Sequence, residues 1–373
     1  MRTSISVFHV TKCLAVFGSL FLLGFSGVEG TTDWKWHQRF PWVYSDKDQG
    51  WQYWQAGSDG SFYHWKNGDR NWYRFEASSE TWVSVGSTFT SGSSQGSSSN
   101  GTVETGSFNL SLEHDGLTRE YQLYVPTSYD GSSQFPLLFN FHGFGGTVTD
   151  HLQAADMRSL ANSEKFLLVY PQGSLLGGYS HWNAAIPSAD NKSSADDIGF
   201  VRKMITSISA SHQVNSDRIY ACGYSNGAFF SYYLACYLSD KIAGVGSVSG
   251  TMLEETYQQG QPTRAVPMIN LHGTADSVVP YAGGDGLVSI SNVVNFWVGK
   301  NAAGTTPATT TLNSGNLSVE RSVYSDSNGT SWVEHYKVNG GGHVWFDLDL
   351  SGSDTNGLIW SFLSRHGLQG PIQ

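Results

Sequence analysis

Residues 219–227 read Ile-Tyr-Ala-Cys-Gly-Tyr-Ser-Asn-Gly, a short apolar run that ends in a serine flanked by glycines. An apolar segment of helical length follows at residues 228–238. This order predicts a strand, a sharp turn and a helix with Ser225 at the turn, which is the pattern of a nucleophile elbow. Gly223 and Gly227 flank the serine because so tight a turn leaves no room for side chains there.

A glycine-flanked serine can also do no more than open a helix, and this chain has 43 glycines. Whether Ser225 is a nucleophile or only opens a helix depends on its partners, because a serine nucleophile needs a histidine base and an acid that orients it. Downstream, an apolar run leads through His-Gly-Thr-Ala to Asp276, and a later run leads through Asn-Gly-Gly-Gly to His343. The acid precedes the histidine, as is usual after such an elbow. We therefore predict that Ser225 is the nucleophile, Asp276 the orienting acid and His343 the base.

Two other histidines compete with His343 for the role of base. His335 falls inside a predicted strand and His366 at the end of a predicted helix, so both are less well placed than a histidine on a glycine-rich loop.

Attack on a carbonyl group creates an oxyanion, which needs two N–H donors. One is predicted to be the backbone N–H of Asn226, directly after the nucleophile. The second is expected on the glycine-rich loop His-Gly-Phe-Gly-Gly at residues 142–146, where we predict the N–H of Phe144. His142 is expected to fix this loop and takes no chemical role.

The long connection between residues 170 and 197 is predicted to shape the substrate pocket, because long loops at a catalytic edge often do so. The candidate substrate-binding residues are His181 and Trp182 on this connection and Tyr224 of the elbow. Trp182 can equally be a buried anchor, and both interpretations stay open here. Asp196 and Asp197 precede a predicted helix and are expected to cap it. No metal site is predicted, because no further ligands converge by sequence.

The composition limits the classes of function. A net charge of −10 without a basic cluster argues against nucleic-acid binding. A basic start, an apolar run at residues 13–25 and small residues up to residue 30 predict a secretory signal peptide, too short for a membrane span. We therefore expect a secreted, extracellular protein with no membrane segment after signal removal. Cys222 and Cys236 flank the elbow, and form either a disulfide or two buried thiols.

Four regions are predicted along the chain. Residues 1–30 are the signal peptide, and residues 31–85 form a small aromatic-rich β module that holds eight of the 13 tryptophans. Turn clusters about every ten residues predict a meander of three or four strands. Its aromatic side chains either form the core of a small sheet or bind a polymer surface. Residues 86–105 are a Ser/Gly-rich linker, and residues 106–373 are the domain that carries the predicted site.

This last region alternates apolar strands and amphipathic helices. The strands include residues 136–141, 166–170 and 219–223, and a helix is predicted over residues 197–211. Continuous apolar strands joined by helices predict an α/β fold with a mostly parallel sheet and helices on both faces.

At this point a resemblance is evident. Residues 106–367 resemble the secreted esterases of the polyhydroxybutyrate depolymerase and feruloyl/acetylxylan esterase group. Several motifs carry it: His-Gly-Phe-Gly-Gly at 142–146, Tyr-Pro-Gln-Gly at 170–173, Asp-Asp-Ile-Gly-Phe-Val at 196–201, the elbow at 223–227, His-Gly-Thr-Ala-Asp at 272–276 and Gly-Gly-Gly-His-Val-Trp at 340–345. The resemblance implies an α/β-hydrolase fold, a serine nucleophile and no cofactor. Phe144 stands where many relatives have cysteine or another small residue, and a larger side chain there is expected to narrow the acyl pocket.

Sequence and resemblance together predict a secreted serine carboxylester hydrolase that works through an acyl-enzyme. Feruloyl or acetyl esters of polysaccharide are the preferred substrates, because a tethered aromatic module suits a polymer. A polyhydroxyalkanoate or another polyester is the alternative within the same chemistry. A non-catalytic polymer- or carbohydrate-binding protein is the alternative from a different class.

Overall fold

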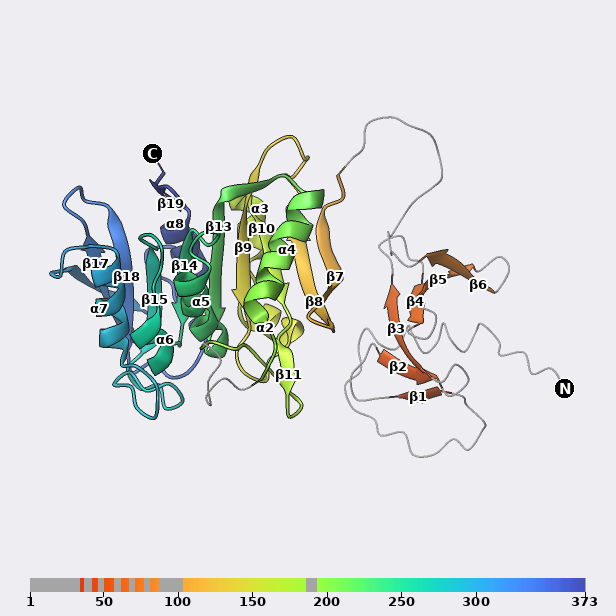
Figure 1. Cartoon of the computed structure of the whole chain (residues 1–373), viewed down its shortest axis with the longest axis horizontal. Helices are drawn as coiled ribbons and strands as arrows, with labels where there is room; N and C mark the ends of the chain where they lie inside the picture. The colour runs from red at the N-terminus through yellow and green to blue at the C-terminus, as the bar shows by residue number, and fades with distance from the viewer. Residues whose placement is uncertain are drawn as a thin grey trace. The chain divides into compact units, whose positions relative to one another are not determined.

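The structure is a computed structural model that describes residues 103–185 and 193–372, together with the backbone of six strands between residues 34 and 86. The chain divides into two compact units, Met1–Asn100 and Gly101–Gln373 (Figure 1). The predicted signal peptide at residues 1–30 and almost all of the predicted linker at residues 86–105 lie outside the described residues.

The first unit contains one six-stranded sheet in which each strand pairs antiparallel with the next along the chain. The strands are β1 (Trp34–Trp36), β2 (Trp42–Ser45), β3 (Gly50–Ala56), β4 (Phe62–Lys66), β5 (Asn71–Glu76) and β6 (Thr81–Gly86). The prediction of three or four strands was too low, because β1 and β2, with three and four residues, give little or no sequence pattern of their own. The two interpretations of its aromatic residues concern side chains outside the described residues.

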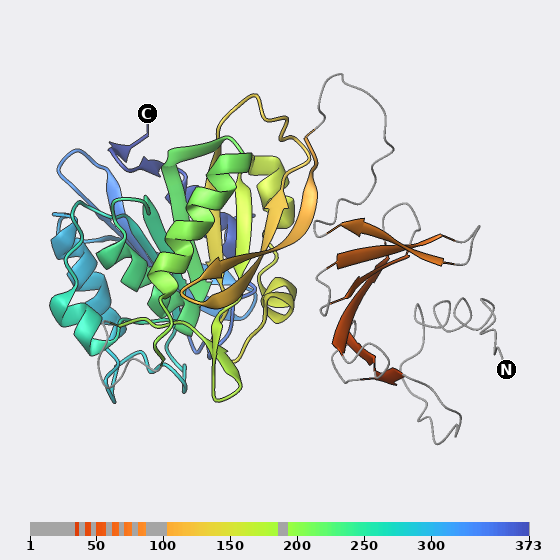
Figure 2. The same ribbon diagram turned by 45° about the vertical axis from the view of Figure 1, so that its right-hand side comes forward.

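The second unit is built on a ten-stranded sheet in the order β16-β17-β18-β15-β14-β13-β9-β10-β8-β7. Its strands are β7 (Gly106–His114), β8 (Leu117–Val125), β9 (Phe135–Phe141), β10 (Leu167–Pro171), β13 (Val214–Tyr224), β14 (Gly244–Val248), β15 (Met268–Gly273), β16 (Ala308–Ser314), β17 (Leu317–Ser325) and β18 (Ser331–Asn339). The six strands from β10 to β18 in the middle of the sheet pair parallel, and antiparallel pairs close both edges (Figure 2).

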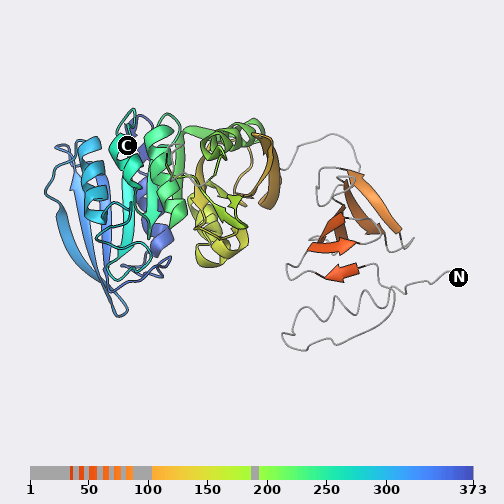
Figure 3. The ribbon, with the colours of Figure 1, turned by 60° about the horizontal axis from the view of Figure 1, so that its bottom comes forward.

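Helices cover both faces of this sheet (Figure 3). They are α2 (Val148–Ala154), α3 (Arg158–Glu164), α4 (Asp197–Ser211), α5 (Asn226–Tyr237), α6 (Glu254–Gln259), α7 (Ile290–Lys300) and α8 (Thr355–Leu363). Buried residues of α4, α5 and α7 pack in one hydrophobic cluster, and those of α3 and α8 pack in a second. The predicted α/β fold, a mostly parallel sheet covered on two faces, is confirmed.

Individual elements differ from their predicted bounds where local packing decides. Helix α4 has the predicted bounds, whereas the segment between β9 and β10 forms two helices, α2 and α3, that separate at Asp156 and Met157. The strand β16 and the short helix α6 were not predicted. The turn between β7 and β8 has a positive φ at Asp115 and Gly116, as a type I′ hairpin requires.

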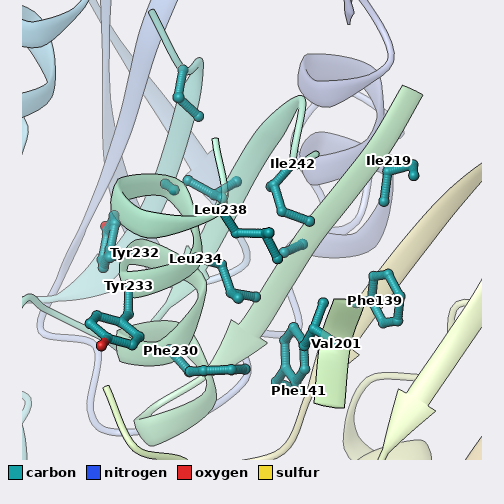
Figure 4. Packing of buried hydrophobic residues seen from close by; sticks show 14 of the residues in the cluster. Phe139, Phe141, Val201, Ile219, Phe230, Tyr232, Tyr233, Leu234, Leu238 and Ile242 are labelled. Carbon is teal, nitrogen blue, oxygen red and sulfur yellow. The ribbon is translucent and has the colours of Figure 1, made fainter. Parts of the chain in front are cut away.

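The helix after the elbow lies deep in the domain. Nine of the 12 residues of α5 are buried, and Phe230, Leu234 and Leu238 extend toward β13 and β9 (Figure 4). Phe141 at the end of β9 meets Phe230 edge to face, with ring centroids 5.1 Å apart. A helix buried on most sides cannot shift without disturbing the core, so the core fixes the position of its first turn.

Cys222 and Cys236 are two free, buried thiols. Cys222 belongs to the cluster on the α8 side of the sheet and Cys236 to the cluster on the α5 side. Because the sheet lies between them, the two sulfur atoms do not pair, and the alternative of two buried thiols is the observed one. Among the described residues, no helix has both the length and the apolar character that crossing a membrane requires.

Candidate active site

Ser225 lies at the turn between β13 and α5, as predicted, with φ 52° and ψ −120°. Few residues other than glycine adopt this region of the backbone map, and such strain is often found at functional sites. A Cβ atom on Gly227 would overlap the carbonyl groups of Phe141 and His142, and one on Gly223 would lie 2.6 Å from the carbonyl of Gly227. These obstacles are backbone atoms that cannot turn aside, so the close approach of α5 to β9 requires glycine at both positions.

The structure brings Ser225, His343 and Asp276 into one hydrogen-bonded chain. Nε2 of His343 is 3.0 Å from Oγ of Ser225, and Nδ1 of His343 is 2.8 Å from Oδ2 of Asp276. Because a carboxylate can only accept, Nδ1 carries the proton and Nε2 is left to accept one from the serine hydroxyl. This is the arrangement in which an imidazole acts as base toward a serine.

Asp276 is buried and its two oxygen atoms have separate tasks. Oδ1 accepts from the backbone N–H groups of Val278 and Val279 at 2.9 and 2.8 Å, whereas Oδ2 faces His343. A second imidazole lies behind it. His272 donates from Nε2 to the carbonyl of Val279 at 2.8 Å, and the same nitrogen is 3.4 Å from Oδ2 of Asp276. Burial lowers the pKa of His272, which keeps this imidazole neutral. The sequence analysis missed its role.

The acid loop and the base loop interlock through their backbones. Ala275 donates to the carbonyl of Gly341 at 2.9 Å, and Gly340 donates to Oγ1 of Thr274 at 2.9 Å. A Cβ atom on Gly273 would overlap Gly341. A Cβ atom on Gly341 would in turn lie 3.2 Å from Cα of Gly273. The lack of a side chain at Gly273 and Gly341 therefore allows the two loops to approach closely enough for the imidazole to reach the carboxylate.

Two hydroxyl groups hold the backbone of the base loop. Tyr224 donates to the carbonyl of His343 at 2.9 Å, and Ser249, directly after β14, donates to the carbonyl of Val344 at 2.8 Å. Ser249 has a φ of 51°, a strain that the sequence does not reveal, and a serine directly after an apolar run is the only sequence-level signal that could have identified it. Tyr224 was predicted to bind substrate, and the structure gives its hydroxyl this contact with the base loop.

The two predicted oxyanion donors belong to segments that meet at Ser225. Asn226 is the first residue of α5, so its N–H has no acceptor within the helix. A Cβ atom on Gly143 would lie 3.3 Å from Cβ of Ser225, which puts the loop with Phe144 beside the nucleophile. His142 fixes that loop: Nε2 accepts from Gly173 at 2.9 Å, and Nδ1 donates to the carbonyl of Gly143 at 2.7 Å. Burial lowers the pKa of His142 to about 4, so the imidazole stays neutral.

His181 and Trp182 are two of the candidate substrate-binding residues, and the packing of Trp182 fits the interpretation as a buried anchor. Both side chains are buried. His181 bonds to the carbonyl of Ser174 at 3.0 Å and to Oγ of Ser193 at 2.9 Å, and Trp182 packs against Phe141 and Phe230. The polar residues around them resemble a loop surface in the sequence, and only the packing of the loop against α4 and α5 reveals their burial.

The other histidines bond elsewhere. His335 is paired through Nε2 with the hydroxyl of Tyr281 at 2.7 Å. His366 bonds to the carbonyls of Phe362 and Ser331 at 3.1 and 2.9 Å. Both are buried, so His343 is the histidine that reaches Ser225, as predicted.

Asp196 caps α4 through the N–H of Gly199 at 2.9 Å, whereas Asp197 is buried in an ion pair with Arg119.

The apolar rim is the set of exposed apolar side chains on the segments that carry the predicted site residues and on the hairpin next to them. Among the described residues eight large apolar side chains are exposed, and five of them belong to segments around the site. These five are Phe144, Leu175, Tyr179, Val278 and Val344. Phe144 and Tyr179 stack, with ring centroids 5.7 Å apart and planes 22° apart. Tyr179 comes from the hairpin of β11 (Ser174–Leu176) and β12 (Tyr179–His181). Over the described ranges, no group of three or more His, Cys, Asp or Glu residues forms a metal site.

Known proteins similar to this chain include esterases. Residues 131–295 match the model of the phospholipase/carboxylesterase family, a span that includes Ser225 and Asp276. The chain is 27% identical over 259 residues to feruloyl esterase B of Piromyces equi, covering 67% of this chain and 46% of that protein. It is 25% identical over 257 residues to the bifunctional acetylxylan esterase/xylanase XynS20E of Neocallimastix patriciarum, covering 69% of this chain and 35% of that protein. The chain thus spans less than half the length of these two relatives.

A solved structure of an acetyl xylan esterase from Aspergillus awamori is similar in fold, with a TM-score of 0.47 and 14% identity over 66% of this chain and 94% of that one. The unit Gly101–Gln373 has an α/β fold with a mostly parallel sheet, and its homologues include feruloyl esterases and acetylxylan esterases.

Proposed function

We propose that this protein is a carboxylic ester hydrolase that forms an acyl-enzyme on Ser225. The observation that supports it most strongly is the chain of two hydrogen bonds, 3.0 and 2.8 Å long, from the serine hydroxyl through His343 to Asp276. A hydroxyl group is a weak nucleophile until a neighbouring base takes its proton, and this arrangement supplies that base.

The reaction follows from the positions of these groups. As Oγ of Ser225 attacks the ester carbonyl, its proton passes to Nε2 of His343, and the carboxylate of Asp276 stabilises the imidazolium that forms. The N–H groups of Phe144 and Asn226 receive the oxyanion. His343 then protonates the leaving alcohol, and a water molecule, activated by the same imidazole, releases the acid from Ser225.

The exposed apolar rim supports an aromatic acyl group as the preferred substrate. A feruloyl group is flat and largely apolar, and stacking on an exposed aromatic ring contributes about 0.5–1.5 kcal/mol beyond the area buried. The stacked pair of Phe144 and Tyr179 offers such a surface, and Phe144 directly follows Gly143, which lies beside the nucleophile. An acetyl group is too small to use it. We therefore propose feruloyl esters of polysaccharide ahead of acetyl esters.

The chemistry is tested by comparing the wild-type protein with Ser225→Ala on p-nitrophenyl acetate. We expect turnover by the wild type and a loss of at least about a thousandfold in the variant, because the nucleophile is gone. Equal inactivity of both proteins would favour a non-catalytic binding protein, and equal activity would exclude Ser225 as the nucleophile.

The substrate is tested with methyl ferulate, acetylated xylan and a film of polyhydroxybutyrate. We expect the highest kcat/KM on methyl ferulate, and we expect Tyr179→Ser to lower it several-fold while turnover of p-nitrophenyl acetate stays unchanged. Release of hydroxybutyrate from the film as the main activity would support the polyester alternative instead.

We further propose that the protein is secreted and that the module at residues 31–85 brings the catalytic domain to its polymer. Its support is the composition of the sequence alone. Mass determination of the protein from the culture medium tests cleavage after residue 30. Unchanged activity on an insoluble feruloylated polymer after removal of residues 31–100 would exclude the targeting role.

A further inference from the structure

Trp182 joins two segments that carry the proposed oxyanion donors. Its backbone N–H donates to Oδ1 of Asn226 at 2.7 Å, and its carbonyl accepts from Nδ2 of the same amide at 3.0 Å. This reciprocal pair leaves the orientation of the Asn226 amide in no doubt, because only its oxygen can accept from an N–H group. The side chain of the residue after the nucleophile is thus bound on both sides to one backbone position.

The indole of the same residue reaches the other segment. Nε1 of Trp182 donates to the carbonyl of His142 at 3.0 Å, directly before the loop with Phe144. The ring is 2% exposed and packs edge to face on Phe141 and parallel to Phe230, with centroid distances of 5.0 and 5.3 Å. A single buried residue therefore connects the start of α5 to the loop after β9.

Trp182 is itself anchored from behind. The N–H of Asn183, the next residue, donates to Oδ2 of Asp197 at 2.8 Å, and Oδ1 of Asp197 is paired with Arg119 at 2.7 Å. Both charged side chains are buried, and the guanidinium also lies over the ring of Phe200. A buried ion pair with further hydrogen bonds holds its position, because movement of either side chain would leave the other charge buried without a partner.

We infer that Trp182 is a positioning residue that sets the spacing between the N–H groups of Phe144 and Asn226, and so the geometry of the oxyanion hole. The inference rests on the proposed function. It assigns to Trp182 an effect on the transition state alone, because the indole is buried and its hydrogen bond and ring contacts are with His142, Phe141 and Phe230. Loss of a whole oxyanion donor lowers kcat by about 10²–10³, so a displaced donor is expected to cost less.

The test is Trp182→Phe, which keeps a buried aromatic ring and removes the indole N–H. Trp297→Phe is the matched control, because Trp297 is equally buried in the same cluster and its Nε1 has no hydrogen-bond partner among the described residues. For Trp182→Phe we expect kcat on p-nitrophenyl acetate to fall about tenfold or more, with KM within twofold and an unchanged shape of the pH profile. For Trp297→Phe we expect wild-type kcat.

A second variant guards against misfolding of the first. Asn226→Ala keeps the backbone N–H and removes both bonds to Trp182 from a partly exposed position, so we expect a similar loss of kcat. Affinity for an alkyl boronic acid, which forms a tetrahedral adduct with the serine, should fall in parallel with kcat in both variants. Wild-type kcat in Asn226→Ala, or an equal loss in Trp182→Phe and Trp297→Phe, would overturn the inference. Wild type and Ser225→Ala measured alongside separate this outcome from failure of the proposed function, which an inactive wild type or an active Ser225→Ala variant would indicate.

Discussion

The carboxylate of Asp276 is surrounded by donors from three directions. Two backbone N–H groups hold Oδ1, while Oδ2 lies between the imidazoles of His343 at 2.8 Å and His272 at 3.4 Å. Through its bond to Val279, His272 also fixes the turn that supplies those N–H groups. The acid that orients the base is therefore itself oriented by a second histidine.

We expect His272→Leu to lower kcat roughly tenfold, equivalent to about 1.4 kcal/mol of transition-state stabilisation. Leucine removes the donor to Val279 and leaves the turn after Asp276 free to move. His272→Gln is the matched variant, because its amide can donate to the same carbonyl, and it should recover most of kcat. Steady-state kinetics on p-nitrophenyl acetate measure both. If the two variants were equally impaired, a packing role for the ring would replace the donor role.

Single residues differ in how well the sequence predicts them. Ser225, Asp276 and His343 follow strand ends in a fixed order, so spacing alone placed them at one edge, and the structure brings them into contact. The contributions of His272, Ser249 and Trp182 depend on which loops pack together. Packing between loops that are distant in the sequence is a property of the tertiary structure, and it leaves no local pattern in the sequence.

At the scale of the elements, the elbow depends on the contact between α5 and the end of β9. We predict that Gly227→Ala gives little or no folded protein, because the new Cβ would overlap two backbone carbonyl groups that cannot move separately. Gly299→Ala on α7 is the control. A Cβ there meets no atom within 4 Å, and alanine favours a helix over glycine by about 1 kcal/mol.

Thermal unfolding followed by circular dichroism measures both variants. The Gly299→Ala protein should unfold at the wild-type temperature or a few degrees above it. A Gly227→Ala protein as stable as the wild type would mean that β9 and α5 can separate, contrary to their packing here.

Most elements were predictable because their apolar periods are long. Helix α4 has the predicted bounds, with Phe200, Val201, Met204 and Ile208 on its buried face. The exceptions are short or polar. Strand β16 reads Ala-Thr-Thr-Thr-Leu-Asn-Ser and is mostly exposed at the edge of the sheet, so it lacks the apolar pattern of the central strands. The break between α2 and α3 occurs where Tyr170 donates to the carbonyl of Ala155 and accepts from Met157, a contact between distant residues.

At the scale of the whole domain, several imidazoles are buried in neutral form. Burial lowers the pKa of His142 to about 4 and the pKa values of His151 and His335 to about 3. In the unfolded chain the same groups titrate near pH 6.5. Between these limits the unfolded state binds more protons than the folded state, so the free energy of unfolding falls as the pH drops below about 6.5.

We predict that stability decreases from pH 7.5 to pH 5 by about 2 kcal/mol for each of these three imidazoles. Urea unfolding at the two pH values measures the difference. In His151→Gln, whose amide can still donate to Asn140, the difference in the free energy of unfolding between the two pH values should be smaller by the contribution of one imidazole. Equal urea midpoints at pH 7.5 and pH 5 would show that these histidines are protonated in the folded domain.

The two sulfhydryl groups on opposite faces of the sheet have a practical consequence. Burial raises the pKa of Cys236 to about 12 and that of Cys222 further still, so neither is available as a thiolate while the domain is closed. Reductants should leave the folded domain untouched, and a coloured disulfide reagent should react only with molecules that have opened. The rate of that reaction would then measure the rate of global opening, with Cys222 reporting on one half of the core and Cys236 on the other.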